Sequence, residues 1–168
     1  MPPTDVIIRA VQIRDATGIA DCVDAVARER LWLAATEGFG IRATDDFIRA
    51  NLVIGNPHFV AALANGEIVG WCDIIAPRSW PEFRHVGQLG MGVLAGWRGV
   101  GIGTALMTTA LAACPARGFS RVELELYAHN TAALELYQRQ GFVEEGRKRG
   151  ARILDGEEQD LILMARRT

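Results

Sequence analysis

The stretch Arg98-Gly99-Val100-Gly101-Ile102-Gly103-Thr104 decides how the rest of the chain is interpreted. It places a glycine at every second position, directly before an apolar run with helical spacing. Backbone N–H groups in such a turn and at a helix N-terminus favour an anion, and the missing Cβ atoms let a phosphate group come close. Arg98 adds a guanidinium that can pair with a phosphate. The stretch therefore predicts a phosphate-binding turn between a strand and a helix, with a tight corner that binds nothing as the alternative.

Two common phosphate-binding loops fit this turn poorly. A nucleoside-triphosphate loop needs a Lys between its last Gly and the Ser or Thr. In this chain Thr104 follows Gly103 directly, so that Lys is missing. A dinucleotide-binding fingerprint needs a glycine at its sixth position, which is Thr104 when counted from Gly99. Glu123 lies 20 residues after Gly103, where a ribose-binding carboxylate would be expected. A dinucleotide site therefore stays open as an alternative.

Hydrophobic patterning surrounds the turn with alternating strands and helices. The expected elements are a strand at 6–11, a helix from 15 to about 34, a helix at 44–54, strands at 58–64, 67–76 and 85–94, the helix after the glycines, a strand at 122–127, a short helix from 130, and strands at 142–154 and 157–165. Thr44 is expected to cap the second helix, and Asn65-Gly66 to form a type I′ turn. This order predicts the α/β class.

Composition narrows the functional classes. A chain of 168 residues with 49% hydrophobic and 23% charged side chains predicts one domain, 1–168. A formal net charge of -2 offers no basic field to nucleic acid or to an anionic membrane. Cys22, Cys72 and Cys114 lack the spacing of a metal or redox site. No signal peptide or membrane span is recognisable. We expect a cytoplasmic protein without metal, nucleic acid or membrane partners.

Two segments resemble the GCN5-related N-acetyltransferase superfamily. Residues 98–103 fit its Gln/Arg-x-x-Gly-x-Gly/Ala motif and follow the segment 89–93, Leu-Gly-Met-Gly-Val, at the usual distance. Residues 130–142, which begin with Asn130, contain Tyr137 and end in Gly-Phe, resemble its Asn-x-x-Ala-x-x-x-Tyr-x-x-x-Gly-Phe segment. The resemblance covers nearly the whole chain. Its C-terminal half is most similar to small-amine acetyltransferases of the phosphinothricin-acetyltransferase type.

The resemblance implies the fold of that superfamily: a mixed central sheet of about six to seven strands with about four helices, splayed between the fourth and fifth strands. It implies transfer of an acetyl group from acetyl-CoA to a primary amine of a small molecule, by direct attack in a ternary complex and without a metal. An enzyme for protein or peptide amines and a non-catalytic acyl-CoA-binding module remain alternatives. A homodimer is also compatible with the resemblance.

The resemblance also implies roles for individual residues. The pantetheine arm of acetyl-CoA would take main-chain hydrogen bonds from Met91, Gly92 and Val93. Asn130 would reach this arm from its helix, in addition to the cap that Asn favours. Tyr137 would protonate the departing thiolate, with a buried core aromatic as the alternative. The pyrophosphate would rest on the turn itself, formed by Arg98, Gly99, Val100, Gly101, Ile102, Gly103 and Thr104.

The general base is left open by the sequence. Many relatives carry a Glu on the strand before the glycine turn, where this chain has Gln88, a side chain without useful basicity. His85 begins the same strand, and histidine is the side-chain type most often used as a general base, so we favour it as the base. Glu37, Glu82 and Glu125 are further candidates, and a chain of water molecules is another route for the proton.

The acceptor is open as well. The family builds its acceptor pocket from the first two helices, their connection and the last hairpin. In those regions Trp32, Phe39 and Trp80 suit an apolar or aromatic amine. Arg147 and Arg149 instead suit an acceptor that resembles an amino acid and carries a carboxylate.

Overall fold

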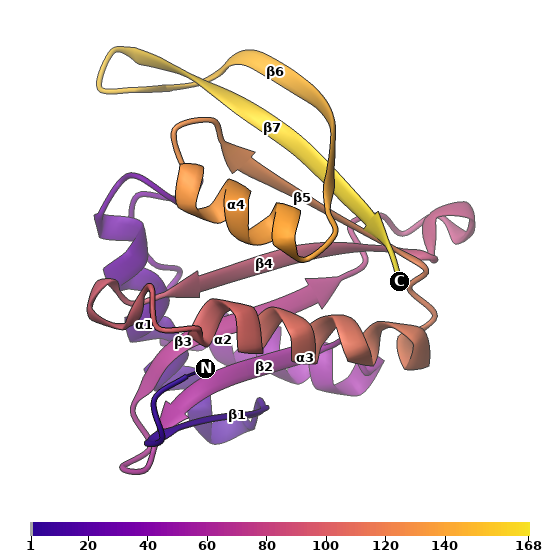
Figure 1. Ribbon diagram of the computed structural model, residues 1–168. Helices are drawn as coiled ribbons and strands as arrows, with labels where there is room; N and C mark the ends of the chain where they lie inside the picture. Colours follow the sequence, from indigo (N-terminus) through magenta and orange to yellow (C-terminus); the bar gives the residue numbers. More distant parts are fainter. Residues whose placement is uncertain (1) are drawn as a thin grey trace.

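The computed structural model describes residues 2–168 and contains a seven-stranded mixed sheet in the order β1-β2-β3-β4-β5-β7-β6 (Figure 1). The strands are β1 Val6–Ala10, β2 His58–Leu63, β3 Ile68–Ile75, β4 Val86–Val93, β5 Arg121–Tyr127, β6 Val143–Leu154 and β7 Glu157–Arg167. The helices are α1 Ala16–Arg28, α2 Ile41–Ile54, α3 Ile102–Arg117 and α4 Thr131–Arg139. This architecture confirms the predicted fold.

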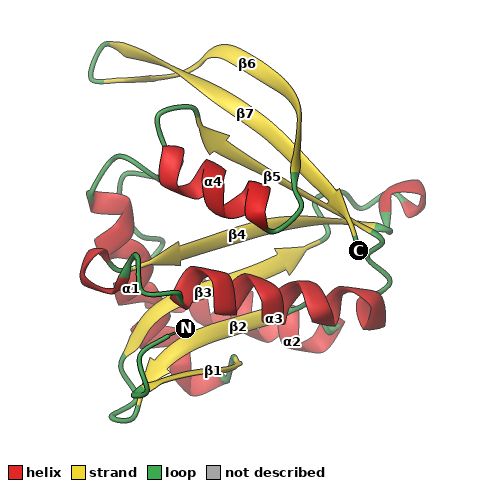
Figure 2. Ribbon diagram, in the orientation of Figure 1, coloured by secondary structure: helices red, strands yellow, loops and turns green. Residues whose placement is uncertain are grey.

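Helices cover both faces of the sheet (Figure 2). In the view of Figure 1, α3 and α4 lie in front of the strands, and α1 and α2 lie behind them. The apolar stripe of α3, which includes Leu106 and Cys114, packs with β4, β5 and β7 into one cluster. Ile19 of α1 and Ile48 of α2 pack with Trp71 of β3 into a second cluster. Strands β2 and β3 are therefore buried between two apolar layers.

Strands β4 and β5 form the only parallel pair within the described residues, and they separate early. Their pairing runs from Val86 opposite Arg121 to Gln88 opposite Glu123 and then stops. On its other side β4 stays paired with β3 as far as Val93. Beyond Gln88, one edge of β4 is therefore open. The predicted splay between the fourth and fifth strands is confirmed.

The first two helices differ from their predicted bounds. Helix α1 ends at Arg28, and Leu31, predicted to lie on its buried stripe, is 45% exposed. Two ion pairs account for this end, since they pull Glu29 towards Arg98 and Arg30, with a φ of 61°, towards Asp155. Helix α2 begins three residues earlier than predicted, at Ile41. Thr44 consequently lies inside its first turn, so the predicted cap at this residue is wrong.

The two hairpin turns differ although both contain an Asx-Gly pair. Asp155 and Gly156 both have positive φ, 53° and 85°, as a type I′ turn requires. In the β2–β3 hairpin only Gly66 does, with a φ of 88°. The N–H of Gly66 donates to the carbonyl of Leu63, and the N–H of Leu63 donates to the carbonyl of Glu67, so the loop contains three residues. The type I′ prediction is therefore wrong, because this hairpin uses a three-residue loop that needs only one left-handed position.

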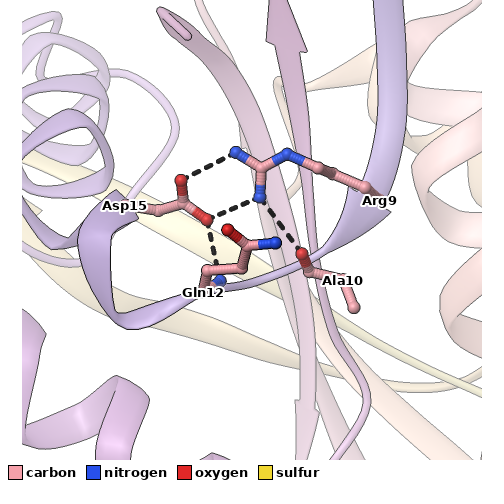
Figure 3. A network of polar contacts seen from close by, with 4 residues as sticks. All are labelled: Arg9, Ala10, Gln12 and Asp15. Carbon is pink, nitrogen blue, oxygen red and sulfur yellow. Dashed lines mark hydrogen bonds and ion pairs between the residues drawn. The ribbon is translucent and has the colours of Figure 1, made fainter.

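A buried ion pair joins β1 to the start of α1 (Figure 3). Both Nη atoms of Arg9 donate to the carboxylate of Asp15 at 2.7 Å, and the N–H of Gln12 donates to it at 2.8 Å. The Asp15 side chain is only 5% exposed. Burial alone would raise its pKa, but the hydrogen bonds from Arg9 and Gln12 lower it below its usual value.

Asp15→Asn should lower the free energy of unfolding by about 2 kcal/mol at pH 7, because it leaves a partly buried guanidinium without its counter-ion. The pKa of Asp15 is lower in the folded than in the unfolded chain, so its stabilisation is present above about pH 4 and is lost as pH falls through the folded-state value. Urea unfolding at pH 7 and pH 3 measures both effects. Asp45→Asn, in an exposed pair with Arg49, is the control and should change stability by less than about 0.5 kcal/mol. Equal losses in both variants would contradict this account.

Candidate active site

The three glycines of the turn serve different purposes. Gly99 and Gly101 have φ values of 76° and 90°, a left-handed conformation that favours glycine. Gly103 lies in the first turn of α3, where a Cβ atom would come within 3.2 Å of Leu136 on α4 and 3.4 Å of the Met91 methyl group. The first two glycines therefore shape the backbone, and the third lets α3 approach α4 and β4.

A cavity of about 760 Å³ lies over this turn and the N-terminus of α3. Its walls come from the N-terminal segment, the turn, the start of α3, and α4: Pro3, Gly99, Val100, Gly101, Gly103, Thr104, Ala132, Glu135, Leu136 and Arg139. The positive end of the helix dipole and the free N–H groups of the first turn face this space, which suits a phosphate group. Arg139 adds a cation that we did not identify from the sequence, where its spacing of four from Glu135 indicates an ordinary helix-surface pair.

The guanidinium of Arg98 binds protein groups. It donates to both carboxylate oxygens of Glu29, at 2.8 and 2.5 Å, and its Nε donates to the Val93 carbonyl at 2.8 Å. The Arg98 hydrogen bond lowers the pKa of Glu29 against the opposing effect of burial. Trp32 also donates to Glu29, at 2.6 Å. Arg98 therefore braces the end of β4 against the end of α1 and does not present a free cation, so only its main chain remains for a phosphate.

The open edge of β4 exposes main-chain groups at alternate residues. The N–H of Leu94 donates to Val69 of β3, so the antiparallel register turns Gly92 towards β3 as well and turns Met91 and Val93 towards the gap. Gly92 is required for packing instead, since a Cβ atom there would come within 2.2 Å of the Trp71 ring. Of the three residues expected along the pantetheine arm, two therefore direct main-chain groups into the gap.

Two residues of the second sequence segment lie on α4. Asn130 accepts a hydrogen bond from the N–H of Ala133 at 3.2 Å, which confirms its role as the helix cap. Tyr137 is buried and packs edge to face against Phe142, with ring centroids 5.8 Å apart. Burial raises the pKa of the Tyr137 hydroxyl well above its usual value, with a smaller contribution from the Cys72 thiol. The hydroxyl is therefore protonated at neutral pH, as a proton donor must be.

The structure places His85 just before the end of β4 that is paired with β5, away from the gap. It is exposed and directly precedes the paired segment, and its carbonyl accepts from Ser120 and Arg121. Met91 lies six residues further along, which corresponds to about 20 Å in a strand. Because the sheet opens only beyond Gln88, a side chain at position 85 does not face the gap.

The other acidic candidates are either paired with a cation or exposed. The carboxylate of Glu125 pairs with Lys148 at 2.7 Å, and Glu37 and Glu82 are exposed. None of the three lines either cavity.

A second cavity, of about 510 Å³, lies on the opposite face of the sheet, between α1, α2 and the segment 29–40. Its lining is mostly apolar: Ile19, Val23, Leu33, Ala34, Ala35, Phe39, Ala43, Thr44, Phe47, His58, Trp71, Asp73, Gly90 and Met91. Two ionisable side chains line it, His58 and Asp73, from directly opposed positions on β2 and β3. The carboxylate of Asp73 lies over Gly90 of β4, where a Cβ atom would be 3.5 Å from its Oδ1.

Burial shifts the pKa values of Asp73 and His58 in opposite directions. It raises the pKa of Asp73 to about 7 and lowers the pKa of His58 to about 4. Among the described residues, neither ring nitrogen of His58 has a hydrogen-bond partner, and its ring packs edge to face against Phe47. Sequence reasoning missed Asp73, although a single carboxylate within the apolar run Ile68–Ile75 was a usable signal.

Comparison with known proteins places these features in a family. A provisionally named phosphinothricin acetyltransferase of Bacillus subtilis (strain 168), YwnH, is 23% identical over 159 residues, which are 95% of this chain and 97% of YwnH. The L-amino acid N-acetyltransferase AaaT of Escherichia coli (strain K12) is 30% identical over 108 residues, 64% of this chain and 66% of AaaT. A phosphinothricin acetyltransferase of Sinorhizobium meliloti, solved in complex with AcCoA, superposes with a TM-score of 0.90 at 19% identity, over 98% of this chain and 89% of that one.

The described residues contain no group of three side chains able to hold a metal ion, and no helix among them is long and apolar enough to cross a membrane.

The sequence model of the Acetyltransferase (GNAT) family matches residues 25–142, a segment that includes the open edge of β4, the glycine turn and Tyr137. That segment is 118 of the 168 residues, and this protein therefore belongs to the acetyltransferase (GNAT) family.

Proposed function

We propose that this protein transfers the acetyl group of acetyl-CoA to the primary amine of a small molecule. One observation carries the proposal: the two cavities approach each other at the open edge of β4. Met91 lines the second cavity, and its methyl group lies beside Gly103, which lines the first. A phosphate-bearing ligand on the glycine turn can therefore extend along β4 towards an amine on the other face of the sheet.

The residues on both sides of this edge fit acetyl-CoA. The amides of the glycine turn and the exposed guanidinium of Arg139 suit its phosphates. The main chain of Met91 and the N–H of Val93, turned into the gap, suit the amide groups of its pantetheine arm, while the Val93 carbonyl is taken by Arg98. The complex of the Sinorhizobium meliloti relative with AcCoA supports this assignment.

The reaction needs stabilisation of an oxyanion and a proton for the departing sulfur. When bound, acetyl-CoA supplies the thioester carbonyl that the amine attacks. The N–H groups of Met91 and Val93 face the gap and are suited to the oxygen of that carbonyl. Tyr137 keeps its proton until a thiolate forms nearby, because burial disfavours its anion.

The segment 29–40 lies over part of the second cavity, which favours a small acceptor over a protein chain. This segment is anchored at both ends and from outside. His129 contacts the Leu31 carbonyl at 2.8 Å, Arg30 pairs with Asp155 of the last hairpin, and Asp24 of α1 accepts from the N–H of Gly38. An extended peptide would have to displace this segment.

The first test is calorimetric titration of the protein with acetyl-CoA and, separately, with NAD. We expect saturable binding of acetyl-CoA and none of NAD, and then release of free thiol when a panel of small amines is added. Binding of NAD alone would overturn the proposal in favour of a dinucleotide site. Binding of acetyl-CoA without turnover of any amine or peptide would overturn the proposed transfer and indicate a non-catalytic acyl-CoA-binding module.

The conformation of the turn supports a sharper test. In Gly99→Ala we expect the Kd for acetyl-CoA to rise about tenfold, because a left-handed φ costs an L-residue about 1–2 kcal/mol. Gly96→Ala is the matched control, since Gly96 has open space around its missing Cβ and no positive φ. Calorimetry on both variants measures the difference. An unchanged Kd in Gly99→Ala would show that the turn does not hold the phosphates.

The role of Tyr137 can be separated from binding. In Tyr137→Phe, we expect kcat to fall about 100-fold while the Kd for acetyl-CoA stays within twofold, because only the proton donor is lost. The chain has two tyrosines, so Tyr127→Phe on β5 is the control and should retain kcat. Equal kcat in Tyr137→Phe and the wild type would remove this residue as the acid.

A further inference from the structure

The second cavity combines apolar walls with one carboxylate. Side chains from α1, α2 and the segment 29–40, among them Val23, Phe39 and Phe47, form its apolar walls. Its volume of about 510 Å³ lies within the range of small-molecule sites, about 300–1,000 Å³. The shape and lining suit an acceptor whose body is hydrocarbon or aromatic.

No guanidinium or ammonium group lines this cavity, within the described residues. Of the arginines suggested by the sequence for a carboxylate, Arg147 pairs with Glu144 at 2.8 Å, and both it and Arg149 are exposed on β6. Arg152 lies outside the wall, where it donates to the carbonyl of Ala34 and stacks over the Tyr127 ring. A carboxylate on the acceptor would thus be desolvated without a counter-ion and close to Asp73.

Asp73 lies beside the open edge of β4, at one end of the second cavity. Its register partner on β4 is Gly90, and the missing Cβ of Gly90 leaves the carboxylate next to the strand edge, one residue before Met91. The residue is 8% exposed and borders the cavity, so a ligand in the cavity can reach it. An ammonium group on an apolar body therefore finds in this cavity a single anionic partner, at the edge where the acetyl group is expected.

The groups around Asp73 leave its charge uncompensated. His58 on β2 faces it and is neutral above about pH 4, since burial lowers its pKa. Gly90 and Met91 of β4 carry no charge, and α1, α2 and the segment 29–40 contribute only uncharged residues to the lining. Both ring nitrogens of His58 are buried and have no hydrogen-bond partner among the described residues, so His58 gives Asp73 neither a charge nor a hydrogen bond.

We propose that the acceptor is a primary amine on an apolar or aromatic body that carries no carboxylate, and that Asp73 binds its ammonium group and accepts its proton. This inference rests on the proposed acetyl transfer. Asp73 takes one proton from R–NH₃⁺, the C–N bond to the acetyl carbon forms, and the C–S bond breaks. Tyr137 gives its hydroxyl proton to the departing sulfur. The nitrogen then loses a second proton, which returns to the Tyr137 oxygen, and Asp73 releases its proton to water.

A pair of substrates that differ only in a carboxylate tests the acceptor class. With saturating acetyl-CoA, we expect kcat/KM for phenethylamine to exceed that for phenylalanine at least 100-fold, and phenylalanine methyl ester to resemble phenethylamine. Equal or better turnover of phenylalanine would overturn the assignment. Calorimetry with acetyl-CoA alone is run in parallel, so that loss of co-substrate binding, which would remove the proposed function itself, is recognised separately.

Asp73→Asn tests the proton acceptor. We expect kcat/KM for phenethylamine to fall at least 100-fold at pH 7 with the Kd for acetyl-CoA unchanged. In the wild type kcat/KM should rise with pH through about 7, because the carboxylate form of Asp73 is the base, and this rise should be absent in the variant. Retention of the same rise in Asp73→Asn would assign it to another group.

Ala35→Trp provides a second variant that keeps Asp73. Ala35 lies in the segment 29–40, outside the helices and strands, and a Trp there should fill part of the cavity. We expect KM for phenethylamine to rise about tenfold or more, with acetyl-CoA affinity unchanged. Unaltered KM would show that the acceptor binds elsewhere.

Discussion

The structure depends on where strands β4 and β5 part. Only three residue pairs join them, from Val86 and Arg121 to Gln88 and Glu123. Parallel strands need a crossover, and here the crossover begins with the glycine turn and continues as α3. The early separation leaves one edge of β4 without a partner while its other edge stays bonded to β3. The open edge, the phosphate-type turn and the two cavities are consequences of this one interruption in the sheet.

Charge pairs then connect this edge to distant parts of the chain. Glu29 and Arg98 are far apart in sequence, and their pair holds the end of α1 against the end of β4. Arg30 and Asp155 similarly connect the segment 29–40 to the last hairpin. The wall of the second cavity is thus held together by residues that lie far apart in the sequence and that no local sequence pattern connects. The cation expected to meet a phosphate has instead become a structural brace, and backbone amides remain as the main anion-binding groups.

The candidate site was only partly predictable for the same reason. The glycine turn, Asn130 and Tyr137 lie in two local segments with characteristic spacing, so sequence could place them on the correct elements. The sequence favours His85 as the base because it lies on the strand before the glycine turn, but the position of a residue along that strand relative to the gap depends on pairing with β5. Asp73 lies on a neighbouring strand, and it became a candidate only when register brought it beside Gly90 and burial raised its pKa to about 7.

By itself the sequence determined the order of the elements, the central turn and the family resemblance, because hydrophobic period, glycine placement and capping residues act over a few positions. Only the tertiary structure decided which charges are neutralised, which carboxylate is desolvated and which main-chain groups stay unpaired. Arg98 and Asp73 show the difference: Arg98 is paired with Glu29, and Asp73 lies in a cavity to which the described residues contribute no cation. Electrostatic state depends on neighbours in space, and those neighbours come from strand register and from a loop far along the chain.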